Sequence, residues 1–500
     1  MKILTEKYKD KIDFRLSCYD RIIINGILPE ISYAHGMTGY LYQHDIRIFD
    51  YAQFAEPFKE KIRFNAESIA KENSIEIEFI RKSGIRKETI IEEKLKERGN
   101  DPGLVHIISV METCPSYKPW HDKQTGKTFV RPDQSKCLHY YFYFIDEYLG
   151  LCYVRVPTWC PFRLQIYFNG HNVLARELAS RGISHSLFDN AFSRIEDQVK
   201  AQELADQIDI KKIHRRLDEF AWKYCPVYKE LGLRYHWSIM QAEYATDIVF
   251  KRQSTLQGIY DEIVKTAIHT VKPENIATFL GRKLDGRYQD EIGNNYNILI
   301  EGSRIKHTMG KCSIKMYDKF GNILRIETTT NDVTFFKHYR EVEHRDGTKS
   351  MKNASLKKGI YSLGMLKDNL SSSNKRYLEF ISAFDNNEIG RKRLFKISSS
   401  RTENNRNYKG FNFFEPNDLR VLQSILKGQF NIAGFQNKDL QKLLGLNSAQ
   451  VSRLLKRLRV HGLIKKIANT YKYYVNKLGK ETIIMGEKIK EIVMIPSFSY

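Results

Sequence analysis

The segment from Asn437 to Val475 constrains the fold more than any other part of this chain. Its residue spacing predicts a helix, a turn, a second helix and two short strands joined by a tight turn. Between Asp439 and Glu481 the chain has ten lysine and arginine residues and no acidic residue, although aspartate and glutamate make up 59 of its 500 residues. A helical pair that is followed by strands and carries many cations with almost no negative charge is typical of a module that enters a nucleic-acid groove. The sequence therefore predicts a nucleic-acid-binding element here.

Capping residues and apolar spacing define the two helices. Asn437 is a suitable N-cap for the first helix, and Gly445 ends it. Asn447 can cap the second helix, with Gln450 completing a capping box. The second helix carries one apolar stripe, formed by Val451, Leu454, Leu455 and Leu458.

Two predicted strands complete the element. Residues 463–467 and 471–475 flank the turn-forming break Ala468-Asn469-Thr470. Basic and polar side chains lie along these strands and away from the apolar stripe of the second helix, so we expect them to contact nucleic acid. The alternative is a basic, solvated helical pair that binds a protein partner. The candidate nucleic-acid-binding residues are Gln450, Arg453, Lys456, Arg457, Arg459, Lys465, Lys466 and Lys472.

The QVSRLLKRLRVHGLI pattern resembles the winged-helix domains of MarR-type regulators. The resemblance covers the last part of the chain and implies binding to double-stranded DNA. Winged helices occur in replication proteins as well as in repressors, so this fold alone leaves both roles open.

The composition favours a polyanionic partner. With 81 lysines and arginines against 59 acidic residues, the formal net charge is +22 and the pI is about 9.4. Such a charge attracts nucleic acid without specifying which kind. The first residues show no apolar core of a secretory signal, no run approaches the roughly 20 apolar residues of a membrane helix, and the seven cysteines form no CxxC pair. We therefore expect reduced thiols, no membrane partner and a cytoplasmic location.

A mid-chain region carries the residues that most suggest catalysis. Glu243 and Asp247 lie four residues apart, so their side chains share one face whether the segment is a strand or a helix. Residues 297–301, 313–317 and 323–328 are predicted to form strands, the last two of which close into a hairpin. On that hairpin two pairs of side chains each share a face: Lys315 with Tyr317, and Arg325 with Glu327.

The order of these motifs resembles that of rolling-circle replication initiators, both the plasmid type without a His-hydrophobic-His metal motif and the filamentous-phage type. That pattern has an Arg-x-Asp-x-Ala-x-Asp strand, a Gly-Ser-Arg turn, a Tyr-Asp-Lys strand end and an Arg-x-Glu strand. Here Gln241 stands where the family has arginine, and Glu243 where it has aspartate. The counterparts in this chain are Gln241 to Asp247, Gly302-Ser303-Arg304, Tyr317-Asp318-Lys319 and Arg325-Ile326-Glu327.

The resemblance implies metal-assisted nicking and joining of DNA, with a single strand at the core. Mg²⁺ or Mn²⁺ would be held by Glu243, Asp247 and Glu327 and would polarise the scissile phosphate. Tyr317 would attack this phosphate and form a covalent phosphotyrosine. The cations that could neutralise charge on the phosphate oxygens are Arg304, Lys315, Lys319 and Arg325.

These residues also have structural interpretations. Tyr317 can be an ordinary strand aromatic, and Asp318-Lys319 can serve as turn residues. Glu243 and Asp247 can form an exposed strand face or salt bridges to basic neighbours. The histidines are dispersed, and a lone one such as His171 is more often structural or solvated than a metal ligand.

The expected fold class is α+β, with an antiparallel initiator-like core and a C-terminal winged-helix domain. No internal repeat is visible, and the polar run from Ser398 to Gly410 is the clearest boundary. Three functions remain open: a DNA-processing initiator or relaxase-like protein, a non-enzymatic regulator, and a structured-RNA-binding protein. The expected parts are a mixed α/β region of unknown role at 1–102, a β-rich and then helical region at 103–230, the initiator-like domain at 231–395 and the winged-helix domain at 411–500.

Overall fold

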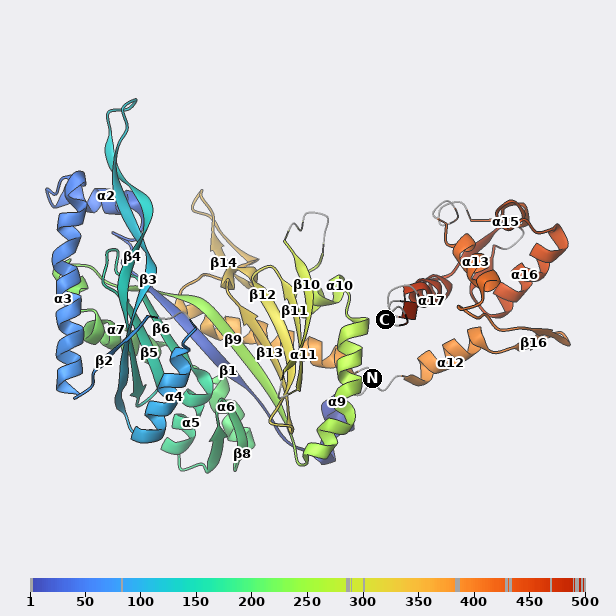
Figure 1. Cartoon of the computed structure of the whole chain (residues 1–500), viewed down its shortest axis with the longest axis horizontal. Helices are drawn as coiled ribbons and strands as arrows, with labels where there is room; N and C mark the ends of the chain where they lie inside the picture. The colour runs from blue at the N-terminus through green and yellow to red at the C-terminus, as the bar shows by residue number, and fades with distance from the viewer. Residues whose placement is uncertain are drawn as a thin grey trace. The chain divides into compact units, whose positions relative to one another are not determined.

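The computed structural model shows a chain of mixed α-helix and β-strand that divides into two compact units, residues 1–384 and 385–500 (Figure 1). No helix within the described ranges is both long and apolar enough to span a membrane. The structure describes residues 3–81, 84–284, 288, 290–299, 302–382, 387–427, 430, 434–467, 470–488, 490, 494–495 and 498.

The first unit is built on one eleven-stranded sheet. Its pairs are antiparallel except for the parallel pair β2–β3. The expected borders at 102/103 and 230/231 lie within this single unit, because β1 pairs directly with β9. In spatial order the strands are β10 (Ile292–Leu299), β11 (Gly302–Met309), β12 (Cys312–Lys319), β13 (Ile323–Thr330), β9 (His236–Phe250), β1 (Ile12–Ile27), β6 (Leu164–Asn169), β5 (Gly150–Pro157), β4 (Thr128–Asp146), β3 (Gly103–His121) and β2 (Ile77–Ile80).

The same chain path occurs twice in this sheet. In the first half, β1 leads through helices to the neighbouring strands β3, β4, β5 and β6, and β6 returns beside β1. In the second half, β9 leads through helices to β10, β11, β12 and β13, and β13 returns beside β9. The antiparallel pair β1–β9 is the seam between the halves. The two halves therefore share one strand order, although their sequences show no repeat. Strand order depends on the pattern of apolar residues, and different residues can form the same pattern.

Helices cover both faces of the sheet. Along β4, Phe142 and Phe144 belong to the main core, whereas Tyr141 and Tyr143 belong to a smaller core on the opposite face. The main core is covered by α2 (Ala34–Gln43), α3 (Tyr51–Glu72), α7 (Ile210–Tyr224), α9 (Gln253–Thr270), α10 (Pro273–Phe279) and α11 (Leu363–Ile381). The opposite face carries α4 (Lys87–Arg98), α5 (Gly170–Ser180), α6 (Gln198–Asp206) and the hairpin of β7 (His185–Phe188) and β8 (Ala191–Ile195). Shorter elements are α1 (Leu4–Lys7), α8 (Val227–Glu230) and the hairpin of β14 (Lys337–Glu343) and β15 (Lys349–Ser355).

The predicted hairpin of residues 313–317 and 323–328 is confirmed as β12 and β13. Gly302-Ser303-Arg304, the counterpart of the family's Gly-Ser-Arg turn, begin β11 directly after the β10–β11 connection, where Leu299 pairs with Gly302. Strand structure prevails there since β11 pairs on both sides, with β10 and with β12. The predicted strand at 297–301 ends in β10 at Leu299, and Glu301 lies outside the described residues.

The second unit begins before the expected boundary. The polar run 398–410 contains a short hairpin, and Phe411 N donates a backbone hydrogen bond to Ile397 O, so the run packs within the unit. The capping box of Asn447 and Gln450 is confirmed. Ala468 and Asn469 lie outside the described residues. The elements of this unit are α12 (Asn387–Ser398), β16 (Arg401–Glu403), β17 (Arg406–Tyr408), α13 (Pro416–Ile425), α15 (Asn437–Leu444), α16 (Ser448–Val460), β18 (Ile464–Lys466), β19 (Tyr473–Val475) and α17 (Lys477–Lys488).

Candidate functional site

The candidate site lies at the seam where β1 and β9 pair. The register of β1 against β9 shifts by one residue here, so Asp20 and Arg21 together lie opposite Glu243. An inserted residue of this kind interrupts the alternation of side chains and re-aims one of them. Alternation from Cys18, which pairs with Ala245, already places Asp20 on the face of Glu243, and the bulge turns Arg21 to that face as well.

Strand register gathers further polar side chains on the same face. Asp247 of β9 lies directly opposite Arg325 of β13. Arg325 also lies opposite Tyr317 of β12, and Glu327 lies opposite Lys315. Directly opposed residues of an antiparallel pair point to the same side of the sheet, so these side chains form one polar cluster.

Three carboxylates of this cluster form an acidic triad: Asp20, Glu243 and Glu327. One carboxylate oxygen from each lies within 4.8 Å of the others. Asp20 and Glu327 are buried, and the Glu243 side chain is 13% exposed. Burial and the nearby charge of Glu327 raise the pKa of Glu243 to about 7. Three hard oxygen donors at this spacing fit a divalent cation such as Mg²⁺ or Mn²⁺, which would relieve their mutual repulsion.

Lys315 and Tyr317 place a cation and a hydroxyl beside the acidic triad. Lys315 Nζ lies 2.8 Å from Glu327 Oε1 and 3.6 Å from Glu243 Oε1. The Tyr317 hydroxyl donates a hydrogen bond of 3.0 Å to Glu327 Oε2. Burial, followed by the charge of Glu327, raises the pKa of Tyr317 well above the usual value of a phenol. The phenol is therefore protonated, and a carboxylate that can accept its proton is already in contact with it.

Arg325 is fully buried behind the acidic triad. Its guanidinium donates to both carboxylate oxygens of Asp247, at 2.6 and 2.7 Å, and to Asp20 at 3.4 Å. Burial alone would raise the pKa of Asp247, but the charge of Arg325 lowers it to about 2. The structure thus places Arg325 and Asp247 in a buried ion pair, in place of the phosphate-binding and metal-ligating roles predicted for them. Asp20 takes the third position of the triad.

The start of α5 supports Asp20. Asn169, the N-cap of this helix, accepts a hydrogen bond from His171 N and donates one of 2.8 Å to Asp20 Oδ1. Gly170 permits the close approach, because a Cβ there would lie 2.2 Å from a carbonyl oxygen of β1. His171 is buried, with Nδ1 3.4 Å from Asp20. Burial opposes its protonation, yet Cys18 and Asp20 hold the pKa of His171 well above its ordinary value.

Two further predicted cations lie at the edges of the cluster. Lys319 is buried, and its Nζ contacts Asp189 at 2.7 Å and the side chain of Asn190, both in the turn of the β7–β8 hairpin. Arg304 is half-buried on β11, directly opposite Tyr317. Arg304 therefore shares the face of the candidate nucleophile, whereas Lys319 ties β12 to the hairpin.

Asp20 and His171 are the parts of the site that sequence reasoning missed. Asp20 interrupts the apolar run LSCYDRIII of β1. A carboxylate in a strand buried on both faces needs a partner, and this signal could have marked it. No local pattern connects it with Glu243 or Glu327, because the connection exists through strand pairing alone. His171 carries no comparable signal, since it follows an ordinary Asn-Gly turn.

The second unit exposes part of the predicted nucleic-acid-binding surface. Gln450 is exposed, but its side-chain oxygen accepts a hydrogen bond of 2.9 Å from Asn447 N and so serves the helix start. The exposed predicted cations are Arg453, Arg459, Lys465, Lys466 and Lys472.

Arg457 and Lys456 make contacts within the second unit instead. The Arg457 guanidinium donates to both oxygens of Asp418, at 2.7 and 2.8 Å, and lies 3.9 Å from the ring centre of Phe411. Lys456 pairs with Glu403. These contacts join α16 to the residues around β16 and α13, so Arg457 stabilises the unit and does not present its guanidinium to a ligand.

Comparison with known proteins adds no relative to this picture. No protein-family model matches the chain, and searches against curated proteins and against solved structures returned no significant match.

Proposed function

We propose that this chain is a DNA-processing protein that breaks and rejoins a phosphodiester through Tyr317, as the resemblance to rolling-circle replication initiators implies. The observation that carries the proposal is the hydrogen bond from the Tyr317 hydroxyl to Glu327, a member of the acidic triad. A nucleophile, a proton acceptor and a set of hard metal ligands thus lie in one cluster.

In the proposed reaction the phenolic oxygen of Tyr317 bonds to phosphorus as the bond from phosphorus to a deoxyribose oxygen breaks. The phenolic proton passes to Glu327, and the departing oxygen takes a proton from solvent. The phosphotyrosine keeps one end of the strand on the protein, and attack by the released hydroxyl reverses the step. Lys315 contributes positive charge beside the phosphate oxygens. A divalent cation bound by the acidic triad would supply polarisation of the phosphate.

The second unit is proposed to bind duplex DNA as a winged-helix module and to deliver the sheet unit to its substrate. Support comes from the two helices α15 and α16, the short strands β18 and β19, and the exposed cations that α16, β18 and the approach to β19 carry. The formal net charge of +22 favours a polyanion over other partners.

The wild-type protein is expected to become covalently attached to single-stranded DNA when Mg²⁺ or Mn²⁺ is present and not when EDTA is present. A pool of random-sequence oligonucleotides, labelled at one end or the other, serves as substrate because the recognised sequence is unidentified. Label that migrates with the denatured protein measures attachment, and the two labels show which end is retained. If neither metal yields an adduct, the enzymatic proposal fails, and duplex or RNA binding alone would favour a regulator or an RNA-binding protein.

Removing one ligand tests the metal independently of activity. Glu243→Gln is expected to weaken Mn²⁺ binding about tenfold or more, because a carboxamide offers a weaker, uncharged ligand. Isothermal titration calorimetry measures the affinity. Glu72→Gln, at an exposed position on α3, is the matched control and should bind Mn²⁺ like the wild type. Equal Mn²⁺ affinities for wild type and Glu243→Gln would show that the acidic triad does not bind the metal.

The double variant Arg453→Ala, Arg459→Ala is expected to weaken duplex DNA binding about tenfold or more, with a shallower dependence on salt, because two exposed phosphate-binding cations are lost. Fluorescence anisotropy at several salt concentrations measures the affinity for duplex DNA and its dependence on salt. Attachment to a short oligonucleotide should persist. Arg457→Ala provides the contrast, since it should lower the thermal stability of the second unit. Unchanged duplex affinity in the double variant would contradict the assigned surface.

A further inference from the structure

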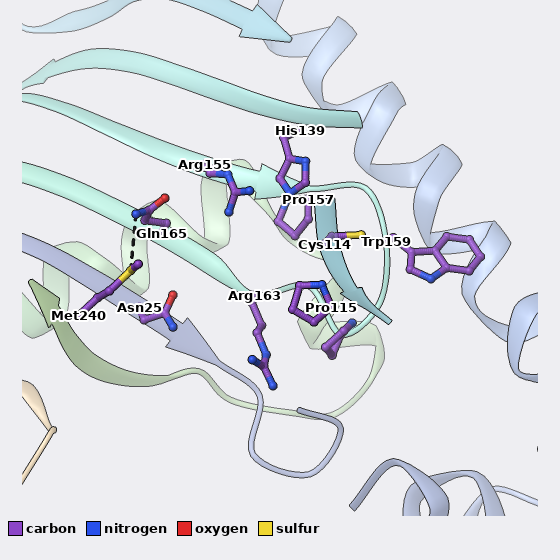
Figure 2. A pocket seen from close by; sticks show the side chains of 11 residues that line it. Asn25, Cys114, Pro115, His139, Arg155, Pro157, Trp159, Arg163, Gln165 and Met240 are labelled. Atoms are coloured by element: carbon purple, nitrogen blue, oxygen red, sulfur yellow. Dashed lines mark hydrogen bonds between the residues drawn. The ribbon is translucent and has the colours of Figure 1, made fainter. Parts of the chain in front are cut away.

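A cleft of about 170 Å³ opens on the first half of the sheet unit (Figure 2). Asn25 of β1, Gln165 of β6 and Arg155 of β5 follow one another across its floor, because Gln165 is the strand-pairing partner of both other residues. Pro115, Pro157 and Trp159 add apolar surface. Carboxylates are absent from the residues that line this cleft among those that the structure describes.

A second irregularity at the seam shapes this cleft. Between Ile23 and Ile24 the register against β9 shifts by one residue, and Met240 is the extra residue on β9. Met240 is 48% exposed and lines the cleft beside Gln165. The seam thus has two bulges, one that turns Arg21 to the face of the acidic triad and one that presents Met240 to the cleft.

Two carboxamides of the cleft lack strong hydrogen-bond partners, whereas Arg155 pairs with Glu112 at 2.8 Å and Arg163 Nη2 donates to the backbone oxygen of Ser32. The Asn25 carboxamide makes no hydrogen bond to any residue in the described ranges, and the Gln165 amide meets only the Met240 sulfur, at 3.6 Å. Arg163 Nε is buried without a hydrogen-bond partner among the described residues. Buried or half-buried amides and guanidinium groups are normally paired, so this arrangement favours a polar ligand.

The cleft and the acidic triad lie on the same face of the sheet. Arg21, Ile23 and Asn25 alternate along β1 and therefore point to one side, and Arg21 lies opposite Glu243. Five residues of strand separate Asp20 from Asn25, which corresponds to roughly 16 Å. Arg21 is exposed between the two sites and lies 5.9 Å from the ring centre of Tyr167. A basic and aromatic path thus leads from one site to the other.

We propose that this cleft binds one base of the single DNA strand whose phosphate is held at Tyr317. The inference rests on the proposed function and specifies how the strand continues beyond the scissile phosphate. Asn25 and Gln165 offer the donors and acceptors that read a base edge, since carboxamides match the hydrogen-bonding pattern of bases. Arg21 and Arg163 lie where they can meet the strand backbone, and the proline side chains accept the flat apolar face of a base.

Binding to catalytically inactive protein tests this inference apart from the chemistry. In a Tyr317→Phe background, Asn25→Leu with Gln165→Met is expected to weaken binding of short single-stranded homopolymers about tenfold and to reduce differences among dA, dC and dT. Fluorescence anisotropy without divalent metal gives the affinities. Gln53→Met, at an exposed position on α3, is the control and should leave them unchanged.

Met240→Trp provides the second variant, because it fills the cleft without removing a polar group and should weaken single-strand binding similarly. If wild type forms the covalent adduct while these variants bind single strands as it does, the cleft inference fails and the proposed function survives. If no adduct forms but the variants weaken single-strand binding, the proposed reaction fails and the cleft remains a base-binding site. The inference would also be overturned if the cleft variants weakened binding of a free mononucleotide but left binding of single-stranded DNA unchanged.

Discussion

Replacing Tyr317 by phenylalanine should abolish covalent attachment to DNA, with a loss of about 10³-fold or more, because the attacking oxygen is removed. The phenylalanine ring preserves the packing on β12, and the substitution removes the hydrogen bond from the Tyr317 hydroxyl to Glu327. Binding of single-stranded DNA and of Mn²⁺ should therefore persist. The measurement is the rate of adduct formation with end-labelled oligonucleotides.

The control for Tyr317→Phe must remove a comparable hydroxyl. Tyr339→Phe suits this purpose, because Tyr339 is 63% exposed on β14, which is not a strand of the eleven-stranded sheet. This variant should retain adduct formation within about threefold. If Tyr317→Phe still forms the adduct and another tyrosine carries the label, the acidic triad serves a different nucleophile and the assignment of Tyr317 is wrong.

Replacing Arg325 by methionine should lower the free energy of unfolding of the sheet unit by about 3–5 kcal/mol. The side chain is 0% exposed and holds both oxygens of Asp247 and one of Asp20. Without the guanidinium, two buried carboxylates lose a counter-charge, and His171 is the remaining cation beside them among the described residues. Urea denaturation followed by a probe within the sheet unit measures the change, since the two units can unfold separately.

A second substitution distinguishes charge from packing as the cause. Adding Asp247→Asn to Arg325→Met removes one uncompensated charge, so the double variant should regain part of the lost stability. Arg194→Met, at an exposed position on β8, should change stability by less than about 0.5 kcal/mol. If Arg325→Met proves as mild as Arg194→Met, the buried ion pair does not have the structural importance assigned to it.

Local pattern predicts much of the fold and part of the site. The hairpin of β12 and β13 follows from alternation and a turn, and it places Lys315, Tyr317 and Glu327 correctly relative to one another. Glu243 lies on the neighbouring strand and reaches the same face. Lys315, Tyr317 and Glu327 meet because a short turn joins β12 to β13. Glu243 faces them because side chains alternate along β9, so every second residue points to the same side of the sheet.

The remaining parts of the site depend on long-range register. Asp20 joins the triad through the pairing of β1 with β9, which leaves no local mark in the sequence. The same limit applies to Arg457, whose spacing on α16 suggests a surface cation. Its partner Asp418 lies on another helix, and only the fold shows that the two meet.

The seam also divides the chemistry between two parts of the polypeptide. Asp20 belongs to the half that ends with β6, whereas Glu243 and Glu327 belong to the half that begins with β9. A fragment containing either half alone would lack a complete ligand set and would expose β1 or β9 as an unpaired edge. Association of the two fragments would therefore restore the sheet and the ligand set in a single step. Metal binding by the acidic triad would then show whether the two halves have assembled.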